Sequence, residues 1–584
     1  MIAPSPQTGS SFTLLLIETG LGLVAIVTAF AFPTVFSGFF ARCERAFARL
    51  ARRKLLACAT VGASALLLRL ALLPLFPAPL PFLPDDFSFL LAADTFAHGR
   101  LANPAPLMWA HFESVHVTVL PTYTSMYFPG PGLVLAAGQV LFGHPWVGEL
   151  ICTALMCAAI CWMLQAWLPP TWALLGGFLC VLRLGLFSYW INTYTGGAPL
   201  AALGGALVLG AFPRLTRTGR MRYGLILGLG ISMLVLSRPY EGMLVCVPVA
   251  VALGHWILRG KNRLSVPVLL RRAAVPLALV AATLTFLGYY DYRAFGNPKT
   301  LPYTVDRTTY AIVPYYVWQH QHPTPTYTTV ELRRFYTDRE AREFYKLRSA
   351  FGIFDFYSKK VTTTLMFFGG MILLPTLFFF GRVFRDRRTR FFAWSLPFWM
   401  VGMGIGVYLI PHYLAPFTAV AYVLGVQALR HMRAATASGG AHVGRTFVRL
   451  TVVACVAMVG FRTFSGPLHL APPHWPINPW IDSWVGPGHF GTERADIIQK
   501  LDRIPGNHLV LVRYQPGHEP IDEWVYNEAN LDSSRVIWAS DLDPRSNQEL
   551  MRFYGDRDVW LVQPDVNGGK LSPYPSASTL RASR

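Results

Sequence analysis

The feature that most constrains this chain is a succession of long apolar segments separated by short basic stretches. About twelve segments have the length and composition of membrane-spanning helices, at 11–32, 55–77, 146–168, 171–190, 198–213, 223–237, 242–258, 273–290, 361–381, 391–410, 413–430 and 447–464. Inside a bilayer a helix satisfies its own backbone hydrogen bonds, so this pattern predicts an all-α polytopic bundle. Only 14% of the residues are charged, against about 25% in soluble proteins, which argues against a soluble enzyme.

The basic residues gather in five connections between these segments, and this distribution predicts the orientation of the bundle. The five clusters are Arg42–Lys54, Arg214–Arg222, Arg259–Arg272, Arg382–Arg390 and Arg430–Arg449. Connections rich in Arg and Lys stay in the cytoplasm, and all five fall on one side if the run Leu133–Phe142 does not cross. That run is too short to span and is expected to be an interfacial or re-entrant helix. Topology therefore explains the net charge of +20, and nucleic acid is not an expected partner.

Three polar pieces then lie outside the cytoplasm, at 78–145, 291–360 and 465–584. We expect residues 1–464 to form the transmembrane domain, with the first two pieces as its outer loops. Residues 465–584 are expected to form a small extracytoplasmic α/β domain, entered through a Pro- and Trp-rich linker at 467–487. Its predicted strands are His508–Tyr514, Arg535–Ala539 and Asp558–Val562, and its predicted helix is Pro544–Tyr554 with Asp543 as N-cap.

The polar loop Pro84–Arg100 directly follows an apolar stretch and carries Asp85 and Asp86, then Asp94 and His98. A carboxylate at the edge of a membrane can accept a proton from a water-borne substrate if it lies within hydrogen-bond reach of the substrate hydroxyl. Burial beside a second acid would raise the pKa of such a carboxyl toward a useful value. We therefore select this loop as the candidate active site. The alternative is a pair of solvated acids that end a helix.

Further along the same piece, His111, Glu113 and His116 join His98 as candidate ligands for a divalent metal. Their spacing matches no tight metal-binding motif. No cofactor is therefore assigned, and metal dependence stays open.

A second constellation, Ser237-Arg238-Pro239-Tyr240-Glu241, ends a short apolar segment on the predicted outer side. The planar guanidinium of Arg238 suits a phosphate, whereas the alternative is an interfacial Arg that reaches lipid headgroups. The turn Pro411-His412-Tyr413 leaves the same choice open. Arg69 and Arg183 lie inside apolar segments, where a charged side chain usually faces the bundle interior or a polar cavity.

Taken in order, these features resemble the GT-C superfamily of integral-membrane glycosyltransferases, which includes protein O-mannosyltransferases, lipid A aminoarabinose transferases and rhizobial galacturonosyltransferases. The resemblance covers about residues 55–430. It rests on an ordered set of motifs: Asp85-Asp86, Tyr127-Phe128-Pro129-Gly130, Arg238 to Glu241, Gly296-Asn297-Pro298, and His412-Tyr413 with Pro416. The segment 11–32 and the C-terminal α/β domain lie outside it.

The resemblance implies a polyprenyl-phosphate-linked sugar donor and an inverting transfer, on the extracytoplasmic face, to a glycan, lipid or protein acceptor. Asp86 or Asp85 would be the general base, and Arg238 would bind the donor phosphate. The other predicted substrate-binding residues are Tyr240, Glu241, His412, Tyr413, Asp94, His98 and Tyr127. One departure is that no Lys or Arg accompanies Tyr127 in the turn Ser125-Met126-Tyr127.

Two other functions fit the sequence less well. A transporter or flippase of lipid-linked sugars would place its acids within helices near the membrane midplane. A membrane-anchored binding or scaffold protein would need no acids at the membrane edge. We therefore expect a glycosyltransferase of a bacterial inner or plasma membrane whose active site faces outward.

Overall fold

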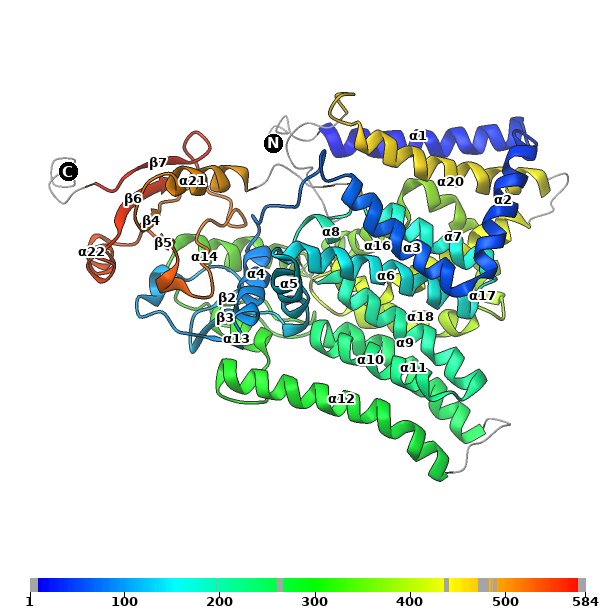
Figure 1. Ribbon diagram of the computed structural model, residues 1–584, viewed down its shortest axis with the longest axis horizontal. Coiled ribbons are helices and arrows are strands. Elements are labelled where there is room, and N and C mark those ends of the chain that lie inside the picture. The colour runs from blue at the N-terminus through cyan, green and yellow to red at the C-terminus, as the bar shows by residue number, and fades with distance from the viewer. Residues whose placement is uncertain are drawn as a thin grey trace.

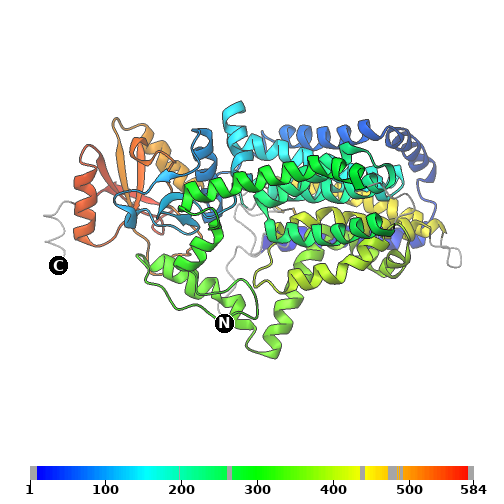
Figure 2. The same ribbon diagram turned by 90° about the horizontal axis from the view of Figure 1, so that it is seen from below.

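The computed structural model describes residues 9–195, 197–259, 266–434, 441–470, 483–484, 486 and 491–575. It consists of a bundle of helices with a small α/β domain at one end (Figure 1). The view from below shows the same division, with most of the bundle helices running along the long axis of the molecule (Figure 2). Most of the predicted linker 467–487 lies outside the described residues.

Every apolar segment predicted to cross the membrane is helical. In the described part of the chain, nine helical stretches are long and apolar enough to span a bilayer. They contain α1 (Gly9–Ala31), α3 (Lys54–Ala71), α6 (Pro145–Trp167), α9 (Ala198–Thr218), α11 (Pro239–Arg259), α12 (Val266–Phe295), α16 (Ala350–Leu373), α19 (Thr418–Arg433) and α20 (Ala441–Thr463). The other three predicted segments form the shorter helices α7 (Pro170–Leu184), α10 (Met221–Ser237) and α18 (Arg390–Gly404). The chain is an integral membrane protein.

The run Leu133–Phe142 lies in α5 (Pro129–Phe142). Its 14 residues reach about 21 Å at 1.5 Å per residue, which is short of a bilayer core of about 30 Å. A proline in its first turn starts this helix, and Gly143 ends it in the left-handed conformation at φ 77°. That this run does not cross the membrane stays a prediction.

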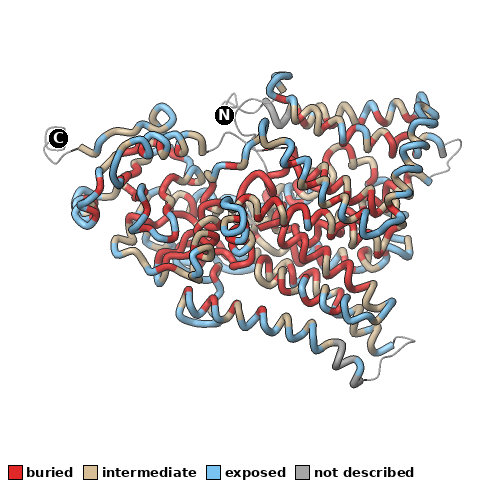
Figure 3. Tube along the Cα trace, in the orientation of Figure 1, coloured by how far each residue is buried: buried red, intermediate tan, exposed pale blue. Residues whose placement is uncertain are grey.

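The centre of the bundle is the most completely buried part of the molecule (Figure 3). Small residues on α9 let it approach its neighbours closely, as is typical of membrane helices. A Cβ added at Gly205 would lie 2.0 Å from the carbonyl oxygen of Pro416 in the 3₁₀ helix η5 (Pro411–Phe417). The basic helix α2 (Ser37–Arg52) and helix α17 (Phe380–Arg385) lie at the end of the bundle opposite the α/β domain (Figure 1).

A buried ion pair inside the bundle joins α1 to α7 and to a break in α16. The break is at Gly370, with φ 60° and ψ −177°. Glu18 of α1 pairs with Arg183 of α7 and accepts a hydrogen bond from the Met371 backbone N–H at 3.3 Å, while Arg183 donates to the Met366 carbonyl at 3.2 Å. These two side chains therefore satisfy backbone groups that the interrupted helix leaves free.

The α/β domain has the strands that the sequence predicts. Strands β4 (His508–Val512), β5 (Val536–Ser540) and β6 (Asp558–Gln563) are parallel, and β7 (Lys570–Pro573) runs antiparallel to β6, in the order β5-β4-β6-β7. Helix α22 (Pro544–Phe553) is capped by Asp543, which accepts from Arg545 N at 2.9 Å and Ser546 N at 3.2 Å. Strand β7 and helix α21 (Thr492–Asp502) were not predicted.

Several further elements are short. They are α4 (Pro84–Ala97), β1 (Asn103–Pro104), η2 (Trp109–His111), β2 (Val117–Thr118), β3 (Thr122–Ser125), α8 (Tyr189–Asn192), α13 (Pro302–Tyr310), α14 (Val330–Arg334), the π-helical turn η3 (Phe335–Arg339), α15 (Ala341–Lys346), and, in the α/β domain, η6 (Leu531–Ser533). The three strands pair in the order β1-β3-β2.

The prediction that Pro84–Arg100 is a polar loop is wrong, because most of it is helix α4. Pro84 stands at the first helical position, and Asp85 and Asp86 lie in the first turn. Proline and carboxylates are favoured there because the first amide groups have no partner within the helix. The residues that the sequence analysis assigned to a loop therefore start a helix.

Candidate active site

A polar cavity of about 310 Å³ lies where the outer pieces meet the helical bundle. Half of the predicted site residues line it: Asp85, Tyr127, Arg238, His412 and Tyr413. They come from four separate parts of the chain, so the fold brings the predicted motifs together.

The acidic side of the cavity is the first turn of α4. Asp85 forms an ion pair with Nδ1 of His116 and accepts a hydrogen bond from the hydroxyl of Tyr127. Burial alone would raise the pKa of Asp85, but the charge and hydrogen bond of His116 and the hydrogen bond of Tyr127 outweigh it and lower the pKa to about 2. Asp85 is therefore ionised at neutral pH and has a fixed orientation.

Asp86 does not line the cavity. Its side chain is fully buried, and its oxygens accept hydrogen bonds from Thr195 Oγ1 at 2.7 Å, Tyr194 N at 2.9 Å, and the N–H groups of Phe82 and Leu83, both at 3.3 Å. Burial raises its pKa to about 6 despite these four bonds. The hydrogen bonds of Asp86 therefore connect the start of α4 to the segment that follows α8.

Cationic side chains line another part of the cavity. Arg238 caps α10, is 5% exposed, and holds its guanidinium carbon 4.6 Å from the ring centre of Tyr413. Lys360 of α16 donates to the carbonyl groups of Gly404 (3.3 Å) and Gly406. Among the described residues Lys360 makes no ion pair, whereas Arg307 is paired with Glu340 and Lys359 with Glu343. Lys360 is thus a buried amine that makes no ion pair with a described carboxylate.

His412 is held in place beside these cations. Its Nδ1 lies 3.1 Å from the hydroxyl of Tyr189, which also accepts a hydrogen bond from the His412 backbone N–H at 3.0 Å. The imidazole is 3% exposed and lines the polar cavity.

Four predicted substrate-binding residues lie outside the cavity lining. The hydroxyl of Tyr240 donates to the Gly402 carbonyl at 2.8 Å, and Glu241 follows it in the first turn of α11. Asp94 accepts from Gln139 Nε2 at 3.1 Å and from the Ala529 backbone N–H at 2.8 Å, and so ties α4 to α5 and to the α/β domain. His98 is exposed and contacts Asp94. These contacts indicate structural roles.

The residues considered as metal ligands do not come together. His111 bonds to the carbonyls of Ser540 and Ser546, at 2.9 and 3.3 Å, and Glu113 accepts from the hydroxyls of Tyr310 and Thr328. Within the described ranges, no three His, Cys, Asp or Glu side chains are grouped so that they could hold a metal ion. The donor set therefore does not fit a metal, and we derive no step through one.

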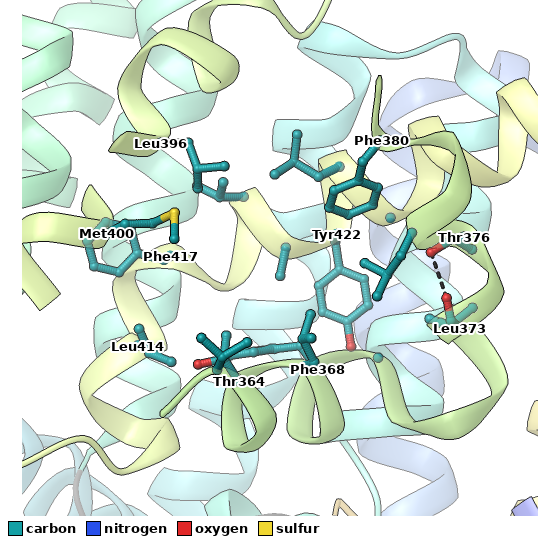
Figure 4. Close-up of a pocket in the computed structure, with 18 of the residues that line it drawn as sticks. Thr364, Phe368, Leu373, Thr376, Phe380, Leu396, Met400, Leu414, Phe417 and Tyr422 are labelled. Carbon is teal, nitrogen blue, oxygen red and sulfur yellow. Dashed lines mark hydrogen bonds between the residues drawn. The ribbon is translucent and has the colours of Figure 1, made fainter. Parts of the chain in front are cut away.

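A second cavity, larger and apolar, adjoins the polar one. It has a volume of about 490 Å³ and is lined mainly by aliphatic and aromatic side chains of α16, α18 and α19, as well as of the 3₁₀ helices η4 (Leu374–Phe379) and η5. Figure 4 shows Phe368, Phe380 and Phe417 among the side chains that surround this space. Lys360 and Leu409 line both cavities. A polar chamber therefore meets an apolar one at a buried lysine.

Several lining residues were missed or misassigned from the sequence, namely His116, Tyr303, Arg307 and Lys360. His116 was considered only as a metal ligand. Lys359 and Lys360 begin an apolar segment on the predicted outer side, where the positive-inside rule expects few cations. The presence of two lysines on this side is the feature of the sequence that could have indicated a role for Lys360.

Comparisons with known proteins were made for sequence families, curated proteins and solved structures. No protein-family model matches the chain, and no curated protein matches it. The ArnT of Cupriavidus metallidurans bound to undecaprenyl phosphate matches over 87% of this chain and 92% of its own, with 13% identity and a TM-score of 0.48. The Archaeoglobus fulgidus oligosaccharyltransferase in complex with Zn and sulfate matches over 87% and 67%, with 12% identity and a TM-score of 0.44. The archaeal oligosaccharyltransferase AglB from Archaeoglobus fulgidus, in complex with an inhibitory peptide and a dolichol-phosphate, matches over 87% of this chain and 69% of its own, with 12% identity and a TM-score of 0.43.

Because these identities are 12–13% and these TM-scores are below 0.5, the similarities assign neither a substrate nor a catalytic residue to this chain. We therefore derive the function from the residues of the site.

Proposed function

We propose that this protein transfers a sugar from a polyprenyl-phosphate-linked donor to an acceptor, with inversion at the anomeric carbon. The observation that carries the proposal is the pair of adjoining cavities, one apolar and one polar, with Lys360 in the lining of both. A lipid-linked sugar has the same sequence of chemical parts: a long apolar chain, a phosphate and a polar sugar.

The polyprenyl chain lies in the apolar cavity, where its burial removes apolar surface from water. Its phosphate lies at the junction, within reach of Lys360 and Arg238, and its sugar lies beside Asp85 and His116. Lys360 suits the phosphate because its ammonium has a fixed position and makes no ion pair with a described carboxylate.

The reaction is a single displacement. An acceptor oxygen bonds to the anomeric carbon as the bond from that carbon to the phosphate oxygen breaks, and the lipid phosphate leaves with the bonding electrons. Attack opposite the leaving group inverts the configuration. Arg238 and Lys360 stabilise the charge that develops on the phosphate, and the Asp85–His116 pair takes the proton of the acceptor. Of the predicted acidic pair, Asp85 and not Asp86 belongs to this site, because only Asp85 lines the cavity.

The site is proposed to face outward from a bacterial inner or plasma membrane. The basic helix α2 and helix α17 lie at the far end of the bundle, which the positive-inside rule assigns to the cytoplasm. The acceptor then comes from the envelope and is a glycan, a lipid or a protein.

Purified protein in lipid nanodiscs tests the proposal with a panel of monosaccharides linked to a long-chain polyprenyl phosphate. Incubation with an envelope extract as acceptor should release lipid phosphate and attach the sugar to a component of the extract. A flippase would move the same donor between the leaflets of a proteoliposome without releasing lipid phosphate, and that result would contradict the proposal. Parallel reactions with Mg²⁺ or with EDTA test for metal dependence.

A further inference from the structure

His116 has an unusual backbone conformation for its residue type. Its φ is 66°, in the left-handed region that residues other than glycine rarely adopt. The conformation is held by its carbonyl, which accepts hydrogen bonds from Ser88 Oγ at 2.6 Å and from Met126 N at 3.3 Å. Strained residues that their surroundings fix in this way gather at functional sites.

The ring of His116 is fixed as firmly as its backbone. Nδ1 contacts the carboxylate of Asp85, and the ring packs edge to face against Phe335 and Tyr127, with centroid distances of 5.2 and 5.9 Å. The other nitrogen, Nε2, makes no hydrogen bond to any residue that the structure describes, and His116 lines the polar cavity. The carboxylate therefore orients the ring by one nitrogen and leaves the second available to a ligand.

We propose that Nε2 of His116 is the atom that takes the proton from the acceptor hydroxyl, and that Asp85 is a positioning residue for this imidazole. The proposal rests on the proposed glycosyl transfer and names the group that performs its proton step. It assigns His116 a catalytic role, in place of the metal-binding role considered from the sequence.

Neutral His116 carries its proton on Nδ1, directed at Asp85, and offers the lone pair of Nε2 to the acceptor hydroxyl. The acceptor oxygen forms its bond to the anomeric carbon, its proton moves to Nε2, and the electrons of the breaking carbon–oxygen bond leave with the lipid phosphate. The resulting imidazolium is stabilised by the Asp85 carboxylate and returns its proton to water when the product leaves.

The titratable groups around His116 favour this role. Asp85 faces it from α4, Tyr127 from the turn before α5, Asp306 from α13, and Glu340 from the start of α15. Burial alone would lower the pKa of His116, but the carboxylates of Asp85, Asp306 and Glu340 outweigh burial and raise it. The raised pKa makes the imidazole the stronger base of the pair, whereas a pKa of about 2 makes the Asp85 carboxylate a weak one.

Chemical rescue of His116→Gly tests the proposal. Glycine adopts φ 66° without strain, so the backbone is kept while the base is removed. We expect turnover to fall by at least about 100-fold, with unchanged binding of a long-chain polyprenyl phosphate and an unchanged midpoint of thermal unfolding. Added imidazole should restore part of the rate in proportion to its neutral form. Pyrazole has the same ring size but is a far weaker base, and it should not.

A second variant separates proton transfer from packing. His116→Asn tolerates the left-handed backbone and can still donate to Asp85, but it cannot take a proton. Its kcat/KM should therefore lack the acidic limb that we expect of the wild type. Equal rescue by imidazole and pyrazole, or wild-type turnover by either variant, would overturn the role of His116 while leaving glycosyl transfer intact. Failure of the wild type to release lipid phosphate from any donor would instead refute the proposed function, and with it this role.

Discussion

Replacing Lys360 by Met should weaken binding of the lipid donor without unfolding the bundle. Lys360 is 9% exposed, packs its ammonium 4.2 Å from the ring centre of Phe356, and lines both cavities. Met keeps most of the length and the apolar stem, so most of the packing is preserved, while the charge and the hydrogen bonds to the Gly404 and Gly406 carbonyls are lost. A hydrogen bond to a charged group contributes about 1.5–3 kcal/mol, so Kd for the donor phosphate should rise about 10- to 150-fold.

The neighbouring Lys359 supplies the matched control. It lines the same polar cavity, but its ammonium lies 2.6 Å from the Glu343 carboxylate and its side chain is 46% exposed. Lys359→Met should therefore change the Kd by less than about fivefold, because exposed ion pairs contribute at most about 1 kcal/mol. Titration of nanodisc-embedded protein with a long-chain polyprenyl phosphate, read by native mass spectrometry, measures both. Equal Kd values for the wild type and the Lys360→Met protein would refute the position assigned to the phosphate.

Three further predictions address the acids and the break in α16. Asp86→Asn should lower the midpoint of thermal unfolding, because it weakens an acceptor of four buried hydrogen bonds at a cost of about 1–3 kcal/mol. A variant with normal stability and no turnover would instead show that Asp86 is the base. Asp85→Asn removes the carboxylate that contributes most to the raised pKa of His116. The acidic limb of kcat/KM should therefore move to lower pH, and the maximal rate should fall about 100-fold. An acidic limb that does not move would show that Asp85 does not control the pKa of His116. Gly370→Ala should destabilise the protein and weaken polyprenyl phosphate binding, since φ is 60° and the new Cβ would lie 2.3 Å from Oε1 of Glu18. An unchanged midpoint of thermal unfolding would show that α16 adjusts to the new side chain without cost.

Much of the architecture follows from the sequence because its signals are long. Segments of about 20 apolar residues and clusters of arginine give helix positions, and alternating patterns with a capping Asp543 give the strands and the helix of the α/β domain. Short polar elements are harder to predict. Helix α4 was taken for a loop because Pro84, Asp85 and Asp86 are common both in turns and in the first turn of a helix.

The site was predictable as a region but not residue by residue. Asp85 and Asp86 are adjacent, yet successive side chains on a helix point about 100° apart, so one lines the cavity while the other is buried behind it. Periodicity does not reveal which is which. Lys360 was missed for a different reason, since its role depends on two cavities that meet, and those are formed by segments distant in the chain.

The hydrogen bond from Ala529 to Asp94 joins residues 435 positions apart, and this separation has a consequence for biogenesis. Ribosomes add about 5–20 residues per second, so about 20–90 s pass between the synthesis of the two partners. During that interval Oδ2 of Asp94 lacks the Ala529 partner that it has in the finished protein. A chaperone that shields this face of α4, or early export of the last segment, would shorten the period in which the half-made protein can misassemble.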